Sequence, residues 1–232
     1  MTTKKQIALL LYPGMVAFDI VGPMQVLAEL PRFAPEYEVV VVSERVEPVD
    51  TDLRAKLVPD KAFDDVPAPD IFIVPGGSHA TLQQMYYPPM REYIRQIAST
   101  AEIIGSVCTG SLILASVGLL EGRTATTHWG YVRILERFGA RYVRKRWVED
   151  GNIITGAGVS AGIDYALHLV ERLAGPDIAR KIQLSLEYDP QPPHEHLNYR
   201  KVGPMMRMIQ LSALVMGHIA ANKAIKLNTE GA

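Results

Sequence analysis

The chain has 232 residues, 48% of them hydrophobic, and a formal net charge of −1 at pH 7, which fits a single globular domain with a terminal appendage. The balanced charge gives no basic excess for nucleic-acid binding, and the single cysteine excludes an intramolecular disulfide framework. The apolar run that ends at Tyr12 is too short for a signal peptide or a membrane span, so we expect a cytoplasmic protein that binds neither nucleic acid nor membrane.

In chain order, short apolar runs alternate with helical patterns. The runs predict buried strands over residues 6–12, 38–43, 70–74 and 103–107, an edge hairpin near 53–58, a short strand after Gly122, and a hairpin of 142–149 with 152–155. The helical patterns cover residues 23–30, 89–99, 112–117, 127–138, 161–173, 177–186 and 205–224, with Pro23 in a first turn and Thr127 as an N-cap. Buried strands that alternate with helices indicate a mostly parallel sheet with helices on both faces.

The most informative stretch is Ser106-Val107-Cys108-Thr109-Gly110, where a predicted strand meets a predicted helix. A sharp strand-to-helix turn of this kind is a nucleophile elbow, and it requires small residues two positions before and two positions after the nucleophile. Ser106 and Gly110 meet this requirement around Cys108. The N-terminal N–H groups of the following helix favour a negative charge, so we expect a Cys108 thiolate near neutral pH that reacts readily with peroxide. The alternative is a buried structural cysteine.

Three candidate groups directly follow predicted strands. Asp19 comes after the first strand, Gly76 and Gly77 come after the third, and Cys108 comes after the fourth. Reactive groups in open α/β sheets collect at the carboxyl ends of the strands, so we expect these residues to form one site. The alternative interpretations are that Asp19 caps a helix before Pro23 and that the two glycines only form a tight turn.

The motifs resemble those of the ThiJ/PfpI superfamily, and the isocyanide hydratase branch most closely. The matching stretches are Phe18–Pro23, Pro75–Gly77, Ser106–Leu112, Arg123–Trp129, Ala161–Asp164 and Leu186–Tyr188. The resemblance spans about residues 6–193 and implies a flavodoxin-like fold, similar to that of class I glutamine amidotransferases. It divides the chain into an α/β domain of residues 1–193 and a helical extension of residues 194–232, packed on the same domain or on a partner subunit.

The resemblance also implies roles for individual residues. Asp19 is expected to be the carboxylic acid that shares a proton with the Cys108 thiol. The Thr109 hydroxyl is expected to hydrogen-bond this acid or a water molecule. The backbone N–H groups of Gly77 and Thr109 are expected to stabilise charge on sulfur, and Gly76 is expected to line the same substrate site.

Three further features of the sequence are a histidine after the elbow, a possible metal-binding stretch and an apolar C-terminal helix. His128 is expected in the substrate site from the family pattern, although a structural histidine is equally compatible with the sequence. The stretch His194-Glu195-His196 has too few neighbouring ligands, so we expect no metal. The apolar side chains between residues 205 and 219 cover more than one helix face, which predicts a homodimer.

Hydration of an organic isocyanide to an N-substituted formamide is the activity that the resemblance implies, through a thioimidate on Cys108 and without a cofactor. One alternative is a glyoxalase-like or deglycase-like enzyme that acts on small carbonyls, although such members usually have Glu where this chain has Asp19. Another is a non-enzymatic domain that senses small molecules or redox state, related to AraC-type regulators. Those regulators carry two helix-turn-helix motifs, for which residues 194–232 offer one helix.

Overall fold

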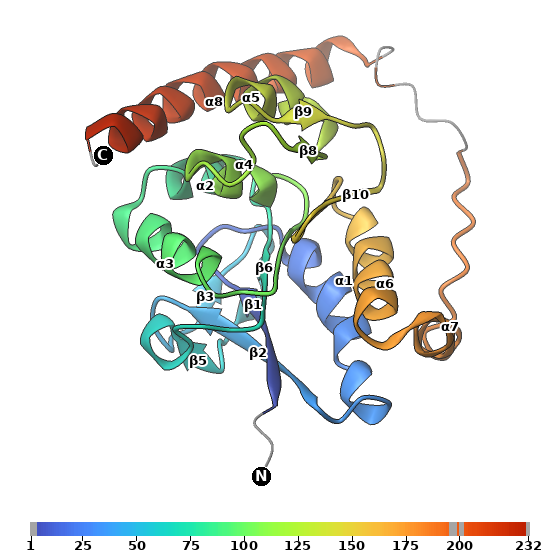
Figure 1. Ribbon diagram of the computed structural model, residues 1–232. Coiled ribbons are helices and arrows are strands. Elements are labelled where there is room, and N and C mark those ends of the chain that lie inside the picture. Colours follow the sequence, from blue (N-terminus) through green and yellow to red (C-terminus); the bar gives the residue numbers. More distant parts are fainter. Residues whose placement is uncertain (1–3, 195–198, 200–201, 231–232) are drawn as a thin grey trace.

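The fold, in a computed structural model that describes residues 4–194, 199 and 202–230, is built on a seven-stranded sheet. Its strand order is β10-β11-β7-β6-β1-β2-β5 (Figure 1). Neighbouring strands are parallel except β10 and β11, which form the predicted hairpin around Asp150-Gly151. The strands of this sheet are β1 (Lys5–Leu10), β2 (Tyr37–Ser43), β5 (Lys61–Ala62), β6 (Ile71–Val74), β7 (Ile103–Ser106), β10 (Trp147–Asp150) and β11 (Ile153–Gly156).

Two short strand pairs lie outside this sheet. The antiparallel pair of β3 (Val49–Asp50) and β4 (Lys56–Leu57) is close to the predicted edge hairpin. The parallel pair consists of β8 (Thr124–Ala125) and β9 (Arg141–Tyr142). The predicted long strand from residue 142 to 149 is therefore divided between β9 and β10.

Helices cover both faces of the sheet, as the sequence predicts. Figure 1 shows α1 and α6 side by side on one face and α2, α3 and α4 on the other. The helices are α1 (Ala17–Leu27), α2 (His79–Gln84), α3 (Pro88–Ala98), α4 (Gly110–Ser116), α5 (Val132–Arg137), α6 (Ala161–Ala174), α7 (Pro176–Ser185) and α8 (Pro204–Glu230), with 3-10 turns η1 (Leu30–Arg32), η2 (Phe63–Asp65) and η3 (Trp129–Tyr131).

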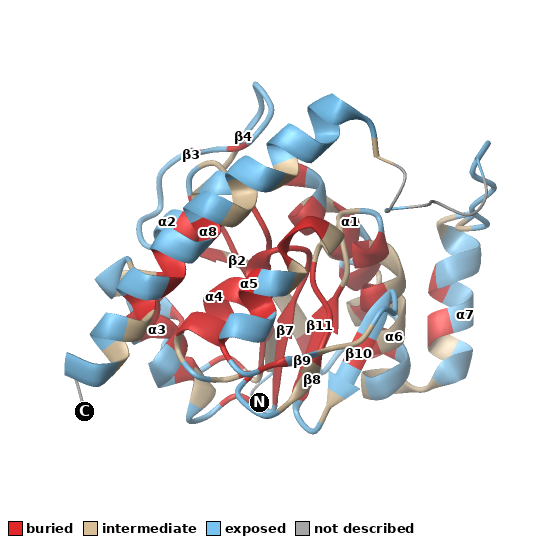
Figure 2. Ribbon diagram, turned by 90° about the horizontal axis from the view of Figure 1, so that it is seen from above, coloured by how far each residue is buried: buried red, intermediate tan, exposed pale blue. Residues whose placement is uncertain are grey.

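The core is the sheet and the inner faces of these helices, as the burial colours in Figure 2 show. Every residue of β6, β7 and β11 is buried. Such strands are covered on both faces, which is why they are short apolar runs with no polar alternation. The parallel arrangement brings the carboxyl ends of β1, β6 and β7 together at one edge.

The helix predicted to begin at Pro23 in fact begins at Ala17, so Pro23 lies inside α1. Proline is unfavourable inside a helix, because it lacks the N–H group that would donate to the preceding turn. Here the face of α1 that carries Pro23 packs against Gly162 of α6, where an added Cβ would lie 3.1 Å from the proline ring. This tertiary contact outweighs the local preference of proline for positions outside a helix interior. The short helix α2 was not predicted.

The N-terminal part of the predicted helix 127–138 is a 3-10 turn followed by α5. His128 rather than Thr127 caps the turn, because its ring accepts the N–H of Gly130. The Thr127 hydroxyl instead donates to the carbonyl oxygen of Cys108 at 3.1 Å. The prediction of Thr127 as the N-cap was therefore wrong, and this residue supports the elbow.

The C-terminal helix α8 lies across α2, α4, α5 and η3 of its own chain. Its contact face consists of small residues, and Gly217, Ala220, Ala221 and Ala224 are buried. An added Cβ at Gly217 would lie 2.7 Å from Ile134 of α5, so the close approach requires glycine. Helix α8 thus packs on other helices of its own chain. It also leaves most of its large apolar side chains exposed.

Candidate active site

The strand-to-helix turn at Cys108 has the geometry of a nucleophile elbow. Cys108 follows β7 and has φ = 58°, a left-handed backbone conformation that is uncommon for a residue with a side chain. Two positions later, an added Cβ at Gly110 would lie 2.2 Å from the carbonyl oxygen of Val74. Only glycine fits this approach of α4 to the end of β6, so the small residue predicted after the nucleophile has a steric cause.

Asp19 lies beside this elbow and does not cap a helix. It belongs to the first turn of α1, whose N-cap residue is Val16, with no side-chain capping bond. The Asp19 carboxylate is fully buried, and its Oδ2 accepts the N–H of Gly76 at 3.0 Å. Its Oδ1 has no nitrogen or oxygen partner among the described residues, whereas the Cys108 thiol is within hydrogen-bonding reach of the carboxyl group. The tertiary fold therefore pairs a thiol with an acid.

Burial raises the pKa of both members of this pair. The pKa of Asp19 rises from its ordinary 3.8 to about 7, mainly because burial penalises the charged carboxylate, although hydrogen bonds from Cys108 and Gly76 oppose the shift. Burial and then the negative charge of Asp19 raise the pKa of the Cys108 thiol. The expectation of a freely populated thiolate was wrong, because the sulfur is enclosed and the following helix has only seven residues. Above about pH 7 the pair holds a single proton.

This shared proton predicts a specific pH profile for alkylation of Cys108. The pair loses its first proton near pH 7, and above that pH the fraction with thiolate on Cys108 and proton on Asp19 no longer depends on pH. The rate of alkylation by iodoacetamide, followed by mass spectrometry from pH 5 to 9, should therefore rise through about pH 7 and then level off. The Asp19→Asn variant is the control, in which the rate should rise without a plateau. A flat profile for the unmodified protein would contradict the shared proton.

Two backbone N–H groups face the sulfur. Those of Val159 and Thr109 hydrogen-bond Cys108 and oppose the rise of its pKa. The N–H of Gly77, predicted for this role, instead donates to the Thr109 hydroxyl oxygen at 3.1 Å. Gly77 is therefore a support of the site rather than a donor to sulfur. Val159 was missed because it is distant from Cys108 in sequence and its own side chain is apolar.

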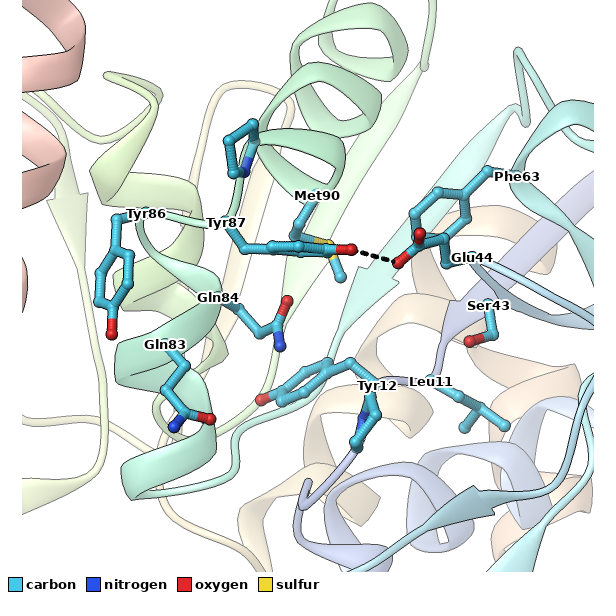
Figure 3. A pocket seen from close by; sticks show the side chains of 12 residues that line it. Leu11, Tyr12, Ser43, Glu44, Phe63, Gln83, Gln84, Tyr86, Tyr87 and Met90 are labelled. Atoms are coloured by element: carbon cyan, nitrogen blue, oxygen red, sulfur yellow. Dashed lines mark hydrogen bonds between the residues drawn. The ribbon is translucent and has the colours of Figure 1, made fainter.

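The Thr109 hydroxyl is fixed by a chain of hydrogen bonds that reaches Tyr12, one wall of the pocket drawn in Figure 3. The Tyr12 hydroxyl lies 2.9 Å from the carbonyl oxygen of Pro75 and 2.9 Å from Thr81 Oγ1, which lies 2.8 Å from Thr109 Oγ1. A carbonyl oxygen only accepts, so Tyr12 donates to Pro75, Thr81 donates to Tyr12, and Thr109 donates to Thr81. With its proton engaged and the N–H of Gly77 already accepted, the Thr109 oxygen can only accept a further bond, from protonated Asp19 or from water.

The glycines after β6 leave room for these contacts. An added Cβ at Gly76 would lie 2.6 Å from the Thr109 nitrogen and 2.7 Å from Asp19 Oδ2. At Gly77 it would lie 2.9 Å from the Cα of Met15. The two residues are more than a tight turn, because a side chain at Gly76 would push the acid and the elbow apart and one at Gly77 would push against the backbone of Met15.

His128 is near the site but is not bonded to the nucleophile. Its Nδ1 accepts the N–H of Gly130 at 3.2 Å, and burial lowers the pKa of the ring, which favours the neutral form. An added Cβ at Gly158 would lie 2.7 Å from this ring, next to Val159. These contacts support the structural interpretation of His128, as a cap that also lines the neighbouring pocket.

Two expected absences concern the described part of the chain. Within residues 4–194, 199 and 202–230, no group of three or more His, Cys, Asp or Glu side chains is placed to hold a metal ion. Glu195 and His196 of the considered metal motif lie outside the described residues. None of the described helices is long and apolar enough to cross a membrane.

One family model and several known proteins are similar to this chain. The DJ-1/PfpI family model matches residues 5–172. The isonitrile hydratase of Pseudomonas putida is 43% identical over 190 residues, which cover 82% of this chain and 81% of that enzyme. The crystal structure of a ThiJ/PfpI family protein from Pseudomonas syringae superposes with a TM-score of 0.85 at 34% identity, covering 95% of this chain and 90% of that one. The transcriptional regulator CdhR of Pseudomonas aeruginosa is 30% identical over 77% of this chain but only 53% of the regulator.

Proposed function

The chain belongs to the DJ-1/PfpI family, and we propose that it is a cysteine-dependent isocyanide hydratase, which converts organic isocyanides to N-substituted formamides. The similarity to isonitrile hydratase supports this, since isonitrile and isocyanide are two names for one group. The observation that best supports this proposal is the buried pair of Cys108 and Asp19, which shares one proton. Hydration of an isocyanide requires a nucleophile and a proton at the same carbon, and this pair supplies both.

The first half of the reaction forms a carbon–sulfur bond. In the reactive form of the pair the proton lies on Asp19, and the Cys108 thiolate attacks the terminal carbon of the isocyanide while Asp19 protonates that carbon. The product is a thioimidate, with the carbon bonded to sulfur and hydrogen and doubly bonded to nitrogen. The N–H groups of Val159 and Thr109 stabilise the thiolate before the attack and when it leaves.

The second half returns the enzyme to its starting state. Asp19, now a carboxylate, takes a proton from water, and the hydroxide adds to the thioimidate carbon. The hydroxyl proton moves to nitrogen as the carbon–oxygen double bond forms and the thiolate leaves. Asp19 again holds the proton, the product is the formamide, and no cofactor is needed, since the net change is addition of one water. The Thr109 oxygen, which can only accept, is suited to hold this water by one of its hydrogens.

A direct assay separates this function from its alternative. We incubate the protein with an aryl isocyanide and, separately, with methylglyoxal, and we follow formamide and lactate. Formamide formation that requires Cys108, with little lactate, is the expected result. Lactate without formamide would instead support the glyoxalase-like alternative.

We also propose a homodimer in which α8 contributes contacts. Besides its small contact face, the helix exposes large apolar side chains along its first four turns and beyond: Met205, Met206, Met208, Ile209, Leu211, Val215, Met216 and Ile219. An apolar surface of this kind is uncommon on a monomer. We expect light scattering at micromolar concentration to give the mass of two chains.

A charged side chain placed on this apolar surface of α8 should dissociate the dimer. Leu211 is 62% exposed, so Leu211→Glu costs little in folding and should shift the mass toward that of one chain. Lys226→Glu on an exposed part of the same helix is the control for a charge change and should leave the mass unchanged. A monomer before any substitution would reject the proposed dimer.

A further inference from the structure

A pocket of about 620 Å³ is lined by neighbours of both members of the catalytic pair, although neither Cys108 nor Asp19 itself belongs to the lining. Phe18, which precedes Asp19, forms one part of its wall, and Val159, whose N–H group hydrogen-bonds the Cys108 sulfur, forms another. This position next to the pair makes the pocket a place for the part of a substrate that does not react.

The charged residues that are described in the lining of this pocket are all cationic. Arg144, Lys145 and Arg146 are consecutive exposed residues that line it, and no Asp or Glu of the described part of the chain does so. Arg146 is already paired with Asp164 of α6. Arg144 lies over the Tyr199 ring at 4.9 Å from its centroid, a contact that leaves its positive charge without a carboxylate partner among the described residues. Two cationic groups, on Arg144 and Lys145, are thus available to a ligand.

The pocket also has flat aromatic walls. Trp129 and Tyr199 stack with ring centroids 5.4 Å apart and an interplanar angle of 14°. Tyr142 and the ring of Phe18 line the same space. Aromatic faces favour a planar apolar body, and the nearby guanidinium and ammonium groups favour an anion at its edge.

The pocket in Figure 3 provides a contrast within the same molecule. It has about 500 Å³ and aromatic walls that include Tyr12, Phe63 and Tyr87, but its charged lining residue is Glu44, which accepts a hydrogen bond from Tyr87 at 2.9 Å. A carboxylate there would repel an anion. Its walls include neither Phe18 nor Val159.

We infer that the substrate is an aryl isocyanide with a carboxylate on its ring, bound with the ring between the aromatic walls and the carboxylate at Arg144 and Lys145. This inference rests on the proposed function and narrows its substrate class. The cations then act on binding and orientation of the substrate, and the chemistry at the terminal carbon is unchanged.

The test compares two substrates that differ in one charge, 4-isocyanobenzoate and its methyl ester. We expect kcat/KM to be at least about tenfold higher for the acid at low salt, and the difference to shrink as salt screens the charges. Arg144→Gln and Lys145→Gln should each lower kcat/KM for the acid about three- to fivefold and leave the ester unaffected. Arg180→Gln is the control, because it removes an exposed charge from α7, outside the pocket.

A binding measurement makes the result independent of turnover. Calorimetry should give a lower Kd for 4-formamidobenzoate than for its methyl ester, and the Arg144 and Lys145 variants should remove this difference. Equal Kd values for the two formamides would overturn the inference. An equal fall in kcat/KM for the acid and the ester in the variants would also overturn it. Hydration of the ester as fast as the acid would also overturn it but leave the proposed hydratase intact, whereas hydration of neither isocyanide would count against the hydratase itself.

Discussion

Replacing Cys108 by serine is expected to lower kcat/KM for isocyanide hydration on the order of 10⁴-fold, to the background rate. A serine hydroxyl has a far higher pKa than a thiol and attacks only when a base removes its proton. Asp19, the acid in contact with this position, is a weak base for an alcohol and must also deliver a proton to the substrate carbon. The variant should therefore bind isocyanide without converting it. The measurement is formamide formation under substrate-saturated and subsaturated conditions.

The control for Cys108→Ser is the fold of the variant. Serine is close in size to cysteine, and Ser111 Oγ already hydrogen-bonds the carbonyl oxygen of residue 108, so the backbone of the elbow is held from outside the side chain. Thermal unfolding should change little. A folded Cys108→Ser protein with more than about one per cent of the original rate would show that sulfur is not the nucleophile, and the thioimidate mechanism would be wrong.

Asp19→Asn is expected to be essentially inactive with isocyanides, whereas Asp19→Glu should retain weak activity. Asn keeps the size of the side chain and its acceptor for the Gly76 N–H, but it can neither deliver a proton to carbon nor take one from water. Glu keeps the chemistry but moves the carboxyl group by about 1.5 Å, the length of one carbon–carbon bond. A displacement of that order costs on the order of a hundredfold in rate. The measurement is kcat/KM for both variants with the same aryl isocyanide.

The pH dependence of the free energy of unfolding shows whether the Asp19→Asn variant is inactive for chemical reasons. The folded pKa of Asp19, about 7, is above its ordinary 3.8, so the protonated acid stabilises the fold fully below about pH 4 and this contribution is lost as pH rises toward 7. The difference between these two pKa values corresponds to at most about 4 kcal/mol in the free energy of unfolding. Asn has no charge to bury, so Asp19→Asn should be more stable than the unmodified protein at pH 8 and lose this advantage at pH 4. Hydration by this variant at nearly the original rate would remove Asp19 from the mechanism.

Much of the fold was predictable because its signals are local. Buried parallel strands are short apolar runs, so β1, β2, β6 and β7 could be recognised within one or two residues of their observed bounds. The Asp150-Gly151 turn identified the hairpin of β10 and β11, since Gly151 adopts a positive φ of 66° that its sequence permits. The start of α1 was not predictable, because Pro23 is a local argument against a helix interior and only packing on Gly162 outweighs it.

The sequence by itself determined which residues can react and roughly where they meet. Cys108 is the only thiol, small residues flank it, and Asp19 and Gly76 follow strands whose carboxyl ends a parallel sheet must bring together. Those conclusions need only spacing and strand order. The state of the reacting groups was decided by the tertiary structure alone. Burial and mutual charge raise the pKa values of the thiol and the acid, and neither effect can be read from neighbours in sequence.

The donors to sulfur were likewise decided by tertiary structure. The Gly77 N–H was an expected donor by analogy with an oxyanion hole, but it donates to the Thr109 hydroxyl oxygen instead. Val159 supplies a donor instead, from a segment that only the folded chain brings to the elbow. Backbone N–H groups are chemically alike in every residue, so a sequence carries no mark of which ones face a site. Their selection depends on the path of the backbone in three dimensions.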